Sequence, residues 1–157
     1  MRKLYLLAGT IVAPAFIAGL WAYSIATRRH RVRVLITNES NDILLVRGVV
    51  SRGEWTLPGG GLKRGESAVT GALRETLEET GINLPKSSLE YICQLKRPEV
   101  KIPYIGLLYS AKINKKSASE LRINQIEIRD ARWFSRNSLP RNLNNEARVA
   151  LSRCFGE

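Results

Sequence analysis

The chain has 157 residues, of which 44% are hydrophobic, and 25 Lys and Arg against 14 Asp and Glu give it a formal net charge of +11. This length provides one domain with a hydrophobic core and excludes two full domains. Two cysteines, Cys93 and Cys154, and a single histidine form neither a zinc pattern nor a catalytic Cys–His pairing, so we expect ordinary reduced thiols.

Residues 4–27 form an uncharged, apolar stretch. As a helix this stretch would be about 36 Å long, more than the roughly 30 Å hydrocarbon core of a bilayer, so its length predicts a transmembrane helix. A cleaved secretory signal is an alternative, because Met1–Lys3 resembles a basic n-region and Ser24–Ala26 a cleavage site, although signal peptides usually have shorter apolar regions. A buried N-terminal helix is a third interpretation. We predict residues 1–29 as a membrane anchor (or signal peptide) with a basic juxtamembrane segment, and residues 30–157 as the second domain.

The charges around this stretch predict its orientation. Arg2 and Lys3 precede it, whereas four arginines follow it: Arg28, Arg29, Arg31 and Arg33. The positive-inside rule then predicts a membrane-anchored protein whose C-terminal domain is cytoplasmic. Residues 1–33 carry a net charge of +6 and the rest of the chain +5, so much of the basic charge is juxtamembrane, where anionic head groups would attract it. The basic composition by itself therefore does not indicate nucleic-acid binding.

Short apolar runs alternate with turn signals after residue 30. Residues 31–36 and 42–47 are predicted as the strands of a hairpin, and residues 54–57 as a short strand that leads into a glycine-rich loop, Pro58–Gly61. A helix is predicted over residues 67–80, with Ser67 as its N-cap and Gly81 as its C-terminal stop. Further strands are predicted at 89–96, 104–113 and 127–134, and a final helix near 144–154. One central helix among many strands favours an α+β sandwich.

The central helix carries an unusual concentration of acid. Glu75, Glu78 and Glu79 stand at positions i, i+3 and i+4, which places three carboxylates on one helical face. Like charges repel at this spacing, and clustered carboxylate oxygens are ligands for a hard divalent cation such as magnesium. The alternative is a solvated helix face paired with Arg74. A separate apolar stripe is expected to face the core: Val69, Leu73 and Leu77.

The spacing of the charged and glycine residues resembles the Nudix box, G-x5-E-x7-R-E-U-x-E-E-x-G-U, in which U is a bulky aliphatic residue. The matching residues are Gly60, Glu66, Arg74, Glu75, Glu78, Glu79, Gly81 and Ile82. Thr76 departs from the pattern at the first U position, where we expect a small cost in packing. Trp55–Gly60 and Ala131–Phe134 also resemble segments of this family, and the resemblance extends over residues 31–153.

The resemblance implies a Nudix hydrolase: an α/β/α sandwich with a mixed sheet that cleaves a nucleoside diphosphate linked to another group, with Mg²⁺ or Mn²⁺. Glu78 and Glu79 match metal ligands, and Glu75 matches a metal ligand that acts as general base in some members. Arg74 would hold the Glu75 carboxylate. The resemblance extends to three further features: Glu66 would brace the loop or join the metal shell through water, Gly59, Gly60 and Gly61 would let the backbone approach the phosphates, and Glu120 or Glu127 would be the distal glutamate.

Several substrates agree with this resemblance, among them a nucleoside triphosphate or deoxynucleoside triphosphate, ADP-ribose and other nucleotide sugars. A different class of function is a non-catalytic Nudix-like module that binds a nucleotide or RNA at the membrane surface. The Lys and Arg residues between 112 and 153 would form an RNA path in that case. Three mutually repelling carboxylates favour the enzyme, because a module without catalysis has no physical need for them.

Overall fold

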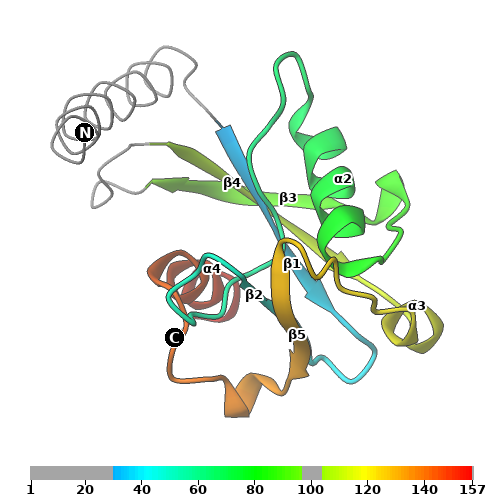
Figure 1. The fold of residues 1–157 in the computed structure, drawn as a ribbon, viewed down its shortest axis with the longest axis vertical. Helices are drawn as coiled ribbons and strands as arrows, with labels where there is room; N and C mark the ends of the chain where they lie inside the picture. The colour runs from blue at the N-terminus through cyan, green and yellow to red at the C-terminus, as the bar shows by residue number, and fades with distance from the viewer. Residues whose placement is uncertain (1–29, 97–103, 157) are drawn as a thin grey trace, which may run out of the picture.

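The computed structural model describes residues 30–96 and 104–156, and a five-stranded sheet lies at its centre (Figure 1). Its strands are β1 (His30–Thr37), β2 (Ile43–Gly48), β3 (Glu90–Lys96), β4 (Ile105–Lys112) and β5 (Ile128–Phe134). Its helices are α2 (Ala68–Thr80), α3 (Lys115–Ser119) and α4 (Asn145–Phe155), with short 3-10 turns η1 (Lys86–Ser88) and η2 (Arg136–Ser138).

The sheet is mixed, with the strand order β3-β4-β1-β2-β5. The neighbours β1 and β4 run parallel, whereas β1 and β2, β2 and β5, and β3 and β4 run antiparallel. Helices α2 and α4 lie on opposite sides of the sheet (Figure 1), so the architecture is an α/β/α sandwich.

Each face of the sheet has its own hydrophobic core, because successive side chains of a strand point to opposite faces. Val32, Val34 and Ile36 of β1 pack in the core beneath α2. Leu35 of β1 packs in the core beneath α4, together with Ala147 and other residues of that helix. The α2 core therefore holds one side of the acidic helix against the sheet.

The glycine-rich segment lies between β1 and β2. These two strands pair at Thr37 and Ile43, next to the hairpin turn. Farther from that turn, the backbone of Val46 on β2 exchanges two hydrogen bonds of 2.9 Å with Thr56. On the other side, Arg31 of β1 forms a bridge with Gly61. The segment from Thr56 to Gly61 is thus fixed to both strands, and it runs towards the start of α2.

The structure confirms the order of the elements predicted from the sequence. The five strands and the helices α2 and α4 begin and end within one residue of their predicted bounds. The short strand predicted at 54–57 is reduced to isolated bridges at Trp55 and Thr56. The sequence analysis missed α3, a five-residue helix whose N-cap is Asn114. Helices of this length have little periodicity to detect.

The predicted transmembrane helix is corrected. Among residues 30–96 and 104–156, no helix is long and apolar enough to cross a membrane. Helix α2, with 13 residues, is about 20 Å long, which is less than the roughly 30 Å of a bilayer core. The stretch that carried the prediction, residues 4–27, lies outside the described residues. The fold is therefore stated as the sandwich alone, and the predicted membrane-anchored location, which depended on that helix, is withdrawn with it.

Candidate active site

Helix α2 begins and ends where the sequence indicates. The side chain of Ser67 accepts a hydrogen bond of 3.1 Å from the backbone N–H of Thr70, which satisfies one of the free amides of the first turn. At the other end, Gly81 is in the left-handed conformation, with φ of 71°, and its N–H donates to Leu77 O at 2.9 Å. These caps fix the extent of the helix that carries the acidic residues.

The buried face of α2 differs in part from the predicted apolar stripe. Val69 and Leu73 pack against the core, as predicted, but Leu77 is 48% exposed. The residues that are fully buried are Gly71, Ala72, Thr76 and Thr80. Leu77 lies about 100° around the helix from Thr76, which is enough to turn it away from the sheet. Thr76 occupies the aliphatic position of the box, and its buried Oγ1 has no hydrogen-bond partner among the described residues.

Arg74 holds three of the glutamates. Its Nε and Nη2 each donate a hydrogen bond of 2.8 Å to Glu66, one to each carboxylate oxygen. Its Nη1 donates to Glu75 at 2.7 Å and to Glu78 at 2.8 Å. The hydrogen bonds from Arg74 lower the pKa of Glu66 to about 2, and the same contacts raise the pKa of Arg74. Arg74 therefore offsets the repulsion between the carboxylates of the acidic face.

Glu79 is hydrogen-bonded to the backbone of the glycine loop. Its Oε2 accepts a hydrogen bond of 2.8 Å from the backbone N–H of Gly59. Burial raises the pKa of Glu79 to about 7, opposed by this hydrogen bond and by the charge of Arg33, while the charges of Glu75 and Glu127 raise the pKa further. Burial and two neighbouring carboxylates therefore disfavour the charged form of Glu79, and Gly59 and Arg33 support it only in part.

The three consecutive glycines have different surroundings. Gly59 has φ of +132°, and a Cβ atom there would lie 2.2 Å from the carbonyl oxygen of Val32. A Cβ atom at Gly60 would lie 2.5 Å from a carboxylate oxygen of Glu75, whereas one at Gly61 would meet nothing within 4 Å. The first position thus requires glycine, because the obstructing atom belongs to the backbone. At the second position the obstructing carboxylate ends a flexible side chain that would have to move, and the third position does not require glycine.

The predicted metal ligands share one face, but they do not form a ready-made cage. Within the described part of the chain, no group of three or more His, Cys, Asp or Glu side chains is arranged to hold a metal ion. Arg74 accounts for this, because it draws Glu66, Glu75 and Glu78 towards itself. The donor set nevertheless fits a hard divalent cation, since its atoms are carboxylate oxygens, and a cation would favour the charged form of Glu79 against the burial and the neighbouring carboxylates that raise its pKa.

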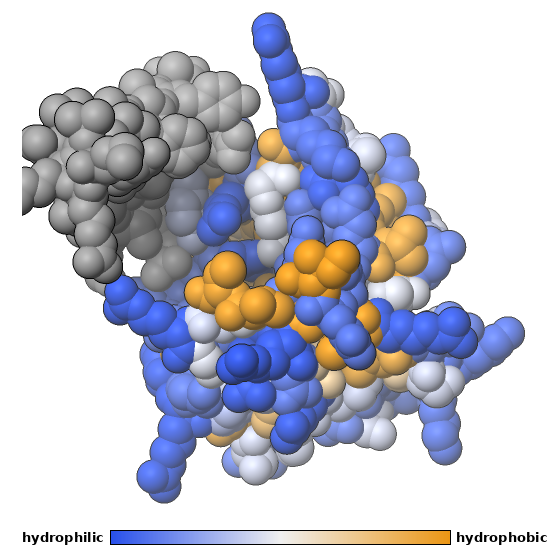
Figure 2. Space-filling view, in the orientation of Figure 1, coloured by the Kyte–Doolittle hydropathy of each residue, from blue (hydrophilic) through white to orange (hydrophobic). Residues whose placement is uncertain are grey.

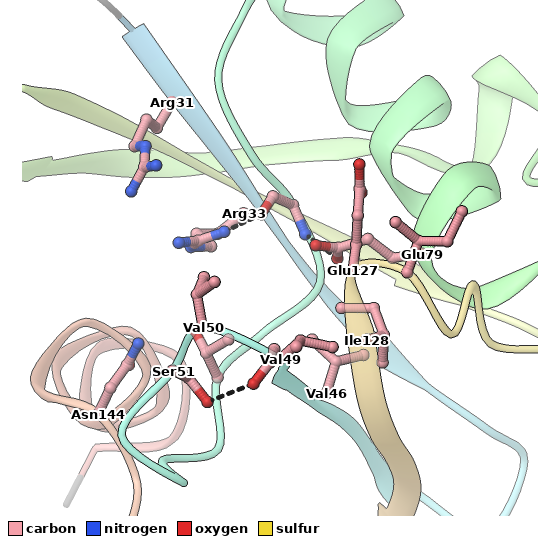
Figure 3. Close-up of a pocket in the computed structure, with 14 residues that line it drawn as sticks. Arg31, Arg33, Val46, Val49, Val50, Ser51, Glu79, Glu127, Ile128 and Asn144 are labelled. Atoms are coloured by element: carbon pink, nitrogen blue, oxygen red, sulfur yellow. Dashed lines mark hydrogen bonds between the residues drawn. The ribbon is translucent and has the colours of Figure 1, made fainter. Parts of the chain in front are cut away.

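A pocket of about 450 Å³ opens beside Glu79 (Figure 3). Its charged lining residues are Arg31, Arg33, Glu79 and Glu127, and its large apolar ones are Val46, Val49, Val50, Ile126 and Ile128. Figure 3 shows Arg31, Arg33 and Glu79 in the upper part of the view and the three valines below them. Val50 is 99% exposed and Ile126 is 85% exposed, so these two apolar side chains are open to solvent at the pocket. Figure 2 shows hydrophobic surface near the middle of this face, amid a largely hydrophilic exterior.

The two candidates for the distal glutamate, Glu120 and Glu127, differ in their position relative to the pocket. Glu127 lines the pocket and lies close enough to Glu79 to influence its pKa. Glu120 is an exposed C-cap residue at the end of α3 and is not among the residues that line this pocket. Geometry therefore favours Glu127, and its catalytic role stays a prediction.

Two features of the site were not predicted from the sequence. Arg33 was expected among the juxtamembrane charges, but it is only 7% exposed and lines the pocket. An arginine in the middle of the apolar run Arg31–Ile36 was the signal that could have identified it. The apolar lining residues Val49 and Ile126 lie in two connecting segments that approach each other only in the folded chain, and no local pattern marks them.

The basic residues predicted as an RNA path make local contacts in the structure. Arg132 forms an ion pair of 2.7 Å with Asp130. Arg136 lies over the ring of Phe155 at 4.2 Å from its centroid and donates to the carbonyl oxygen of the same residue at 2.9 Å. These contacts explain the positions of two of the arginines, and RNA binding stays a prediction.

Comparison with known proteins gives the family. The family model described as the NUDIX domain matches residues 27–154. A candidate 8-oxo-dGTP diphosphatase from Bacillus subtilis (strain 168) is 48% identical over 58 residues, which are 35% of this chain and 36% of that protein. The NAD-capped RNA hydrolase of Schizosaccharomyces pombe is 30% identical over 118 residues, which are 74% of this chain and 30% of that protein. The matched part thus spans about a third of the length of each of these relatives.

A solved structure shares the fold. The crystal structure of a MutT NUDIX hydrolase from Burkholderia pseudomallei superposes with a TM-score of 0.70 at 24% identity, over 80% of this chain and 96% of that one. At this identity the likeness shows the fold alone. The family model matches well over half of the chain, and the chain therefore belongs to the family of proteins with a NUDIX domain.

Proposed function

We propose that this chain is a pyrophosphohydrolase that depends on Mg²⁺ or Mn²⁺ and cleaves the diphosphate linkage of a nucleoside diphosphate derivative. The observation that carries the proposal is the position of Glu79, which lies on the acidic face of α2 and also lines a pocket of about 450 Å³. A pocket of this volume suits a small-molecule substrate. A metal held at the acidic face would thus meet a substrate held in the pocket.

Glu75, Glu78 and Glu79 would hold the metal. When bound, the metal neutralises phosphoryl oxygens and lowers the pKa of a bound water, which is the chemistry that hydrolysis of a diphosphate needs. Arg74 keeps its bidentate contact with Glu66 even if Glu75 and Glu78 turn towards a cation. Its guanidinium therefore stays paired, and it continues to hold the loop residue Glu66 beside the helix.

The pocket lining supports a substrate with a charged end and an apolar end. The diphosphate would lie near Glu79 and the glycine loop, where Arg31 supplies positive charge. The guanidinium of the buried Arg33 is already paired with Glu146. The base would lie on the apolar lining, against Val50 and Ile126, whose side chains are exposed to solvent. Glu127 lines the same pocket, and we propose that either Glu75 or Glu127 accepts the proton of the attacking water.

The substrate class includes nucleoside triphosphates and deoxynucleoside triphosphates, ADP-ribose and other nucleotide sugars. The names of the two curated relatives add 8-oxo-dGTP and NAD-capped RNA as compounds to test. An RNA substrate would use basic residues outside the pocket, and its binding would then weaken steeply with added salt.

The test measures product release from a panel of the compounds named above, by the full chain, with and without Mg²⁺. A Glu78→Gln variant serves as the active-site substitution, because Glu78 is exposed and its loss should not affect folding. Glu90→Gln is the matched control, since Glu90 is also exposed but lies on β3. We expect turnover that requires the metal, that falls strongly in Glu78→Gln and that Glu90→Gln retains. Tight metal-independent binding without turnover of any compound would instead indicate a non-catalytic binding module.

A further inference from the structure

Two carbonyl groups of the glycine loop are held by the backbone of β1. The N–H of Val34 donates to Pro58 O, and the N–H of Val32 donates to Gly60 O, both at 2.9 Å. Successive peptide groups of an extended chain point to opposite sides. A neighbouring strand can therefore donate hydrogen bonds only to every second carbonyl group. The carbonyl of Gly59, between these two, therefore needs a donor from elsewhere.

Arg33 supplies that donor. Arg33 lies on β1, and its Nη1 donates a hydrogen bond to the carbonyl oxygen of Gly59. Its Nε donates at 2.8 Å to Glu146, a residue in the first turn of α4. Arg33 is 7% exposed and Glu146 is 2% exposed, so this is a buried ion pair. Burial acts to lower the pKa of Arg33, but the charge and hydrogen bond of Glu146 outweigh it and raise that pKa.

A gain in folding stability does not by itself explain why a buried ion pair is present at Arg33 and Glu146. Removing two charges from water has a large desolvation cost, and apolar residues of similar volume often give equal or greater stability at such positions. Here the pair is also imperfect, because Oε1 of Glu146 is buried without a hydrogen-bond partner among the described residues. The contact of Arg33 with the Gly59 carbonyl offers a different reason.

The peptide group that Arg33 holds lies between two carboxylates of the acidic face. The N–H of Gly59 donates to Glu79 at 2.8 Å. On the other side of the peptide, the carboxylate of Glu75 lies against Gly60, where a Cβ atom would be 2.5 Å from its Oε2. The residues on both sides of this peptide are glycines, which restrain its rotation least of all residues. Without a side chain to hold the Gly59 carbonyl, the backbone of these two glycines could shift, and the Gly59 N–H and the Gly60 α-carbon would then displace both carboxylates.

We propose that Arg33 is a positioning residue: with Glu146 as its anchor on α4, it holds the Gly59 carbonyl, and so fixes the backbone of Gly59 and Gly60 and thereby the places of Glu75 and Glu79. This role rests on the proposed hydrolase function. The orientation of the peptide itself can be measured whether or not the chain is active.

The test compares Arg33→Met with the double variant Arg33→Met/Glu146→Met. The single variant leaves Glu146 buried and unpaired, and we expect a large fall in its melting temperature. The double variant removes both charges, and we expect its melting temperature to return to within a few degrees of the unmodified chain. Its kcat should stay about 10- to 100-fold low with little change in KM, because the carboxylates are misplaced. A double variant that regains both stability and kcat would show that the pair is only structural.

A second readout does not depend on activity. We expect conformational exchange at the amide of Gly60 in the double variant, measured by NMR relaxation dispersion, while the amide of Leu44, on β2 of the same sheet, stays unaffected. A Gly60 amide unchanged from that of the unmodified chain would overturn the proposal. If neither chain hydrolyses any compound but the Gly60 amide changes as expected, the proposed function fails and the positioning by Arg33 stands.

Two controls complete the design. Glu146→Gln keeps an oxygen acceptor for Arg33 Nε, so we expect it to retain most of kcat. The pair Arg47→Met/Asp130→Met removes the 3.2 Å ion pair that joins β2 to β5, together with the ion pair of Asp130 with Arg132. We expect its kcat to stay within about twofold, which would show that the loss of an ion pair elsewhere does not mimic the loss of Arg33.

Discussion

The carboxylate of Glu75 lies directly against the α-carbon of Gly60, with room for a hydrogen atom but not for a methyl group. A Cβ atom at Gly60 would be 2.5 Å from Glu75 Oε2, closer than such atoms pack. Because the obstructing atom ends a flexible side chain, the fold can accept a methyl group here by moving the carboxylate. The glycine thus fixes the position of the glutamate more than the shape of the loop.

Gly60→Ala should therefore lower kcat by about 10- to 100-fold while the melting temperature changes little, because the displaced Glu75 no longer meets its partners in the productive position. Gly61→Ala is the matched control, since a Cβ atom there meets nothing within 4 Å. Steady-state kinetics and thermal melts of both variants check this. Equal losses of activity in the two variants would contradict the assignment.

The two distal glutamates offer a second comparison. Glu127→Gln should lower kcat by at least about tenfold, because Glu127 lines the pocket beside Glu79 and its charge would be lost from the site. Glu120→Gln should leave kcat unchanged, because Glu120 is an exposed residue at the end of α3. Kinetics of both variants at saturating Mg²⁺ provide the measurement. If only Glu120→Gln reduced kcat, the geometric choice between the two would be wrong.

Two buried threonines of α2 should respond oppositely to the same substitution. Thr76→Val removes a buried hydroxyl without a hydrogen-bond partner among the described residues, so we expect the free energy of unfolding to rise by about 1 kcal/mol. Thr80→Val removes a hydroxyl that donates to Thr76 O at 2.6 Å and accepts from Ile82 N at 3.3 Å, so we expect a fall of about 1 to 2 kcal/mol. Urea denaturation of both variants measures these changes. A loss of stability in Thr76→Val would mean that its hydroxyl has a partner, such as a buried water.

The apolar pocket lining should affect binding more than chemistry. Ile126→Ser should raise KM about 5- to 10-fold with kcat nearly unchanged, because it removes apolar surface that the base would cover, worth about 1 kcal/mol or more. Val149→Ser is the control: Val149 is 38% exposed, but it lies on α4 and does not line the pocket. Both are measured with the best substrate of the panel. An unchanged KM in Ile126→Ser would place the base elsewhere.

Local patterns were sufficient to predict most of the fold and the acidic face. Apolar alternation and turn residues gave the strands, and the caps Ser67 and Gly81 gave the extent of α2. The spacing of Glu75 and Glu79 places them on one helical face in any context, because residues four apart in a helix are neighbours. The direction of Leu77 was predicted wrongly, because the choice between two adjacent faces of a helix depends on what packs against it.

The sequence by itself was sufficient to predict which residues would carry the chemistry, because the Nudix box is contained within one loop and one helix. Only the tertiary structure decided how these residues are held and what they face. Arg33 and Glu146 are 113 residues apart in the chain and meet because β1 and α4 pack together. The pocket likewise joins segments near Val50 and Glu127 that are distant in sequence. Contacts of this kind depend on the packing of the whole sandwich, and no local spacing contains them.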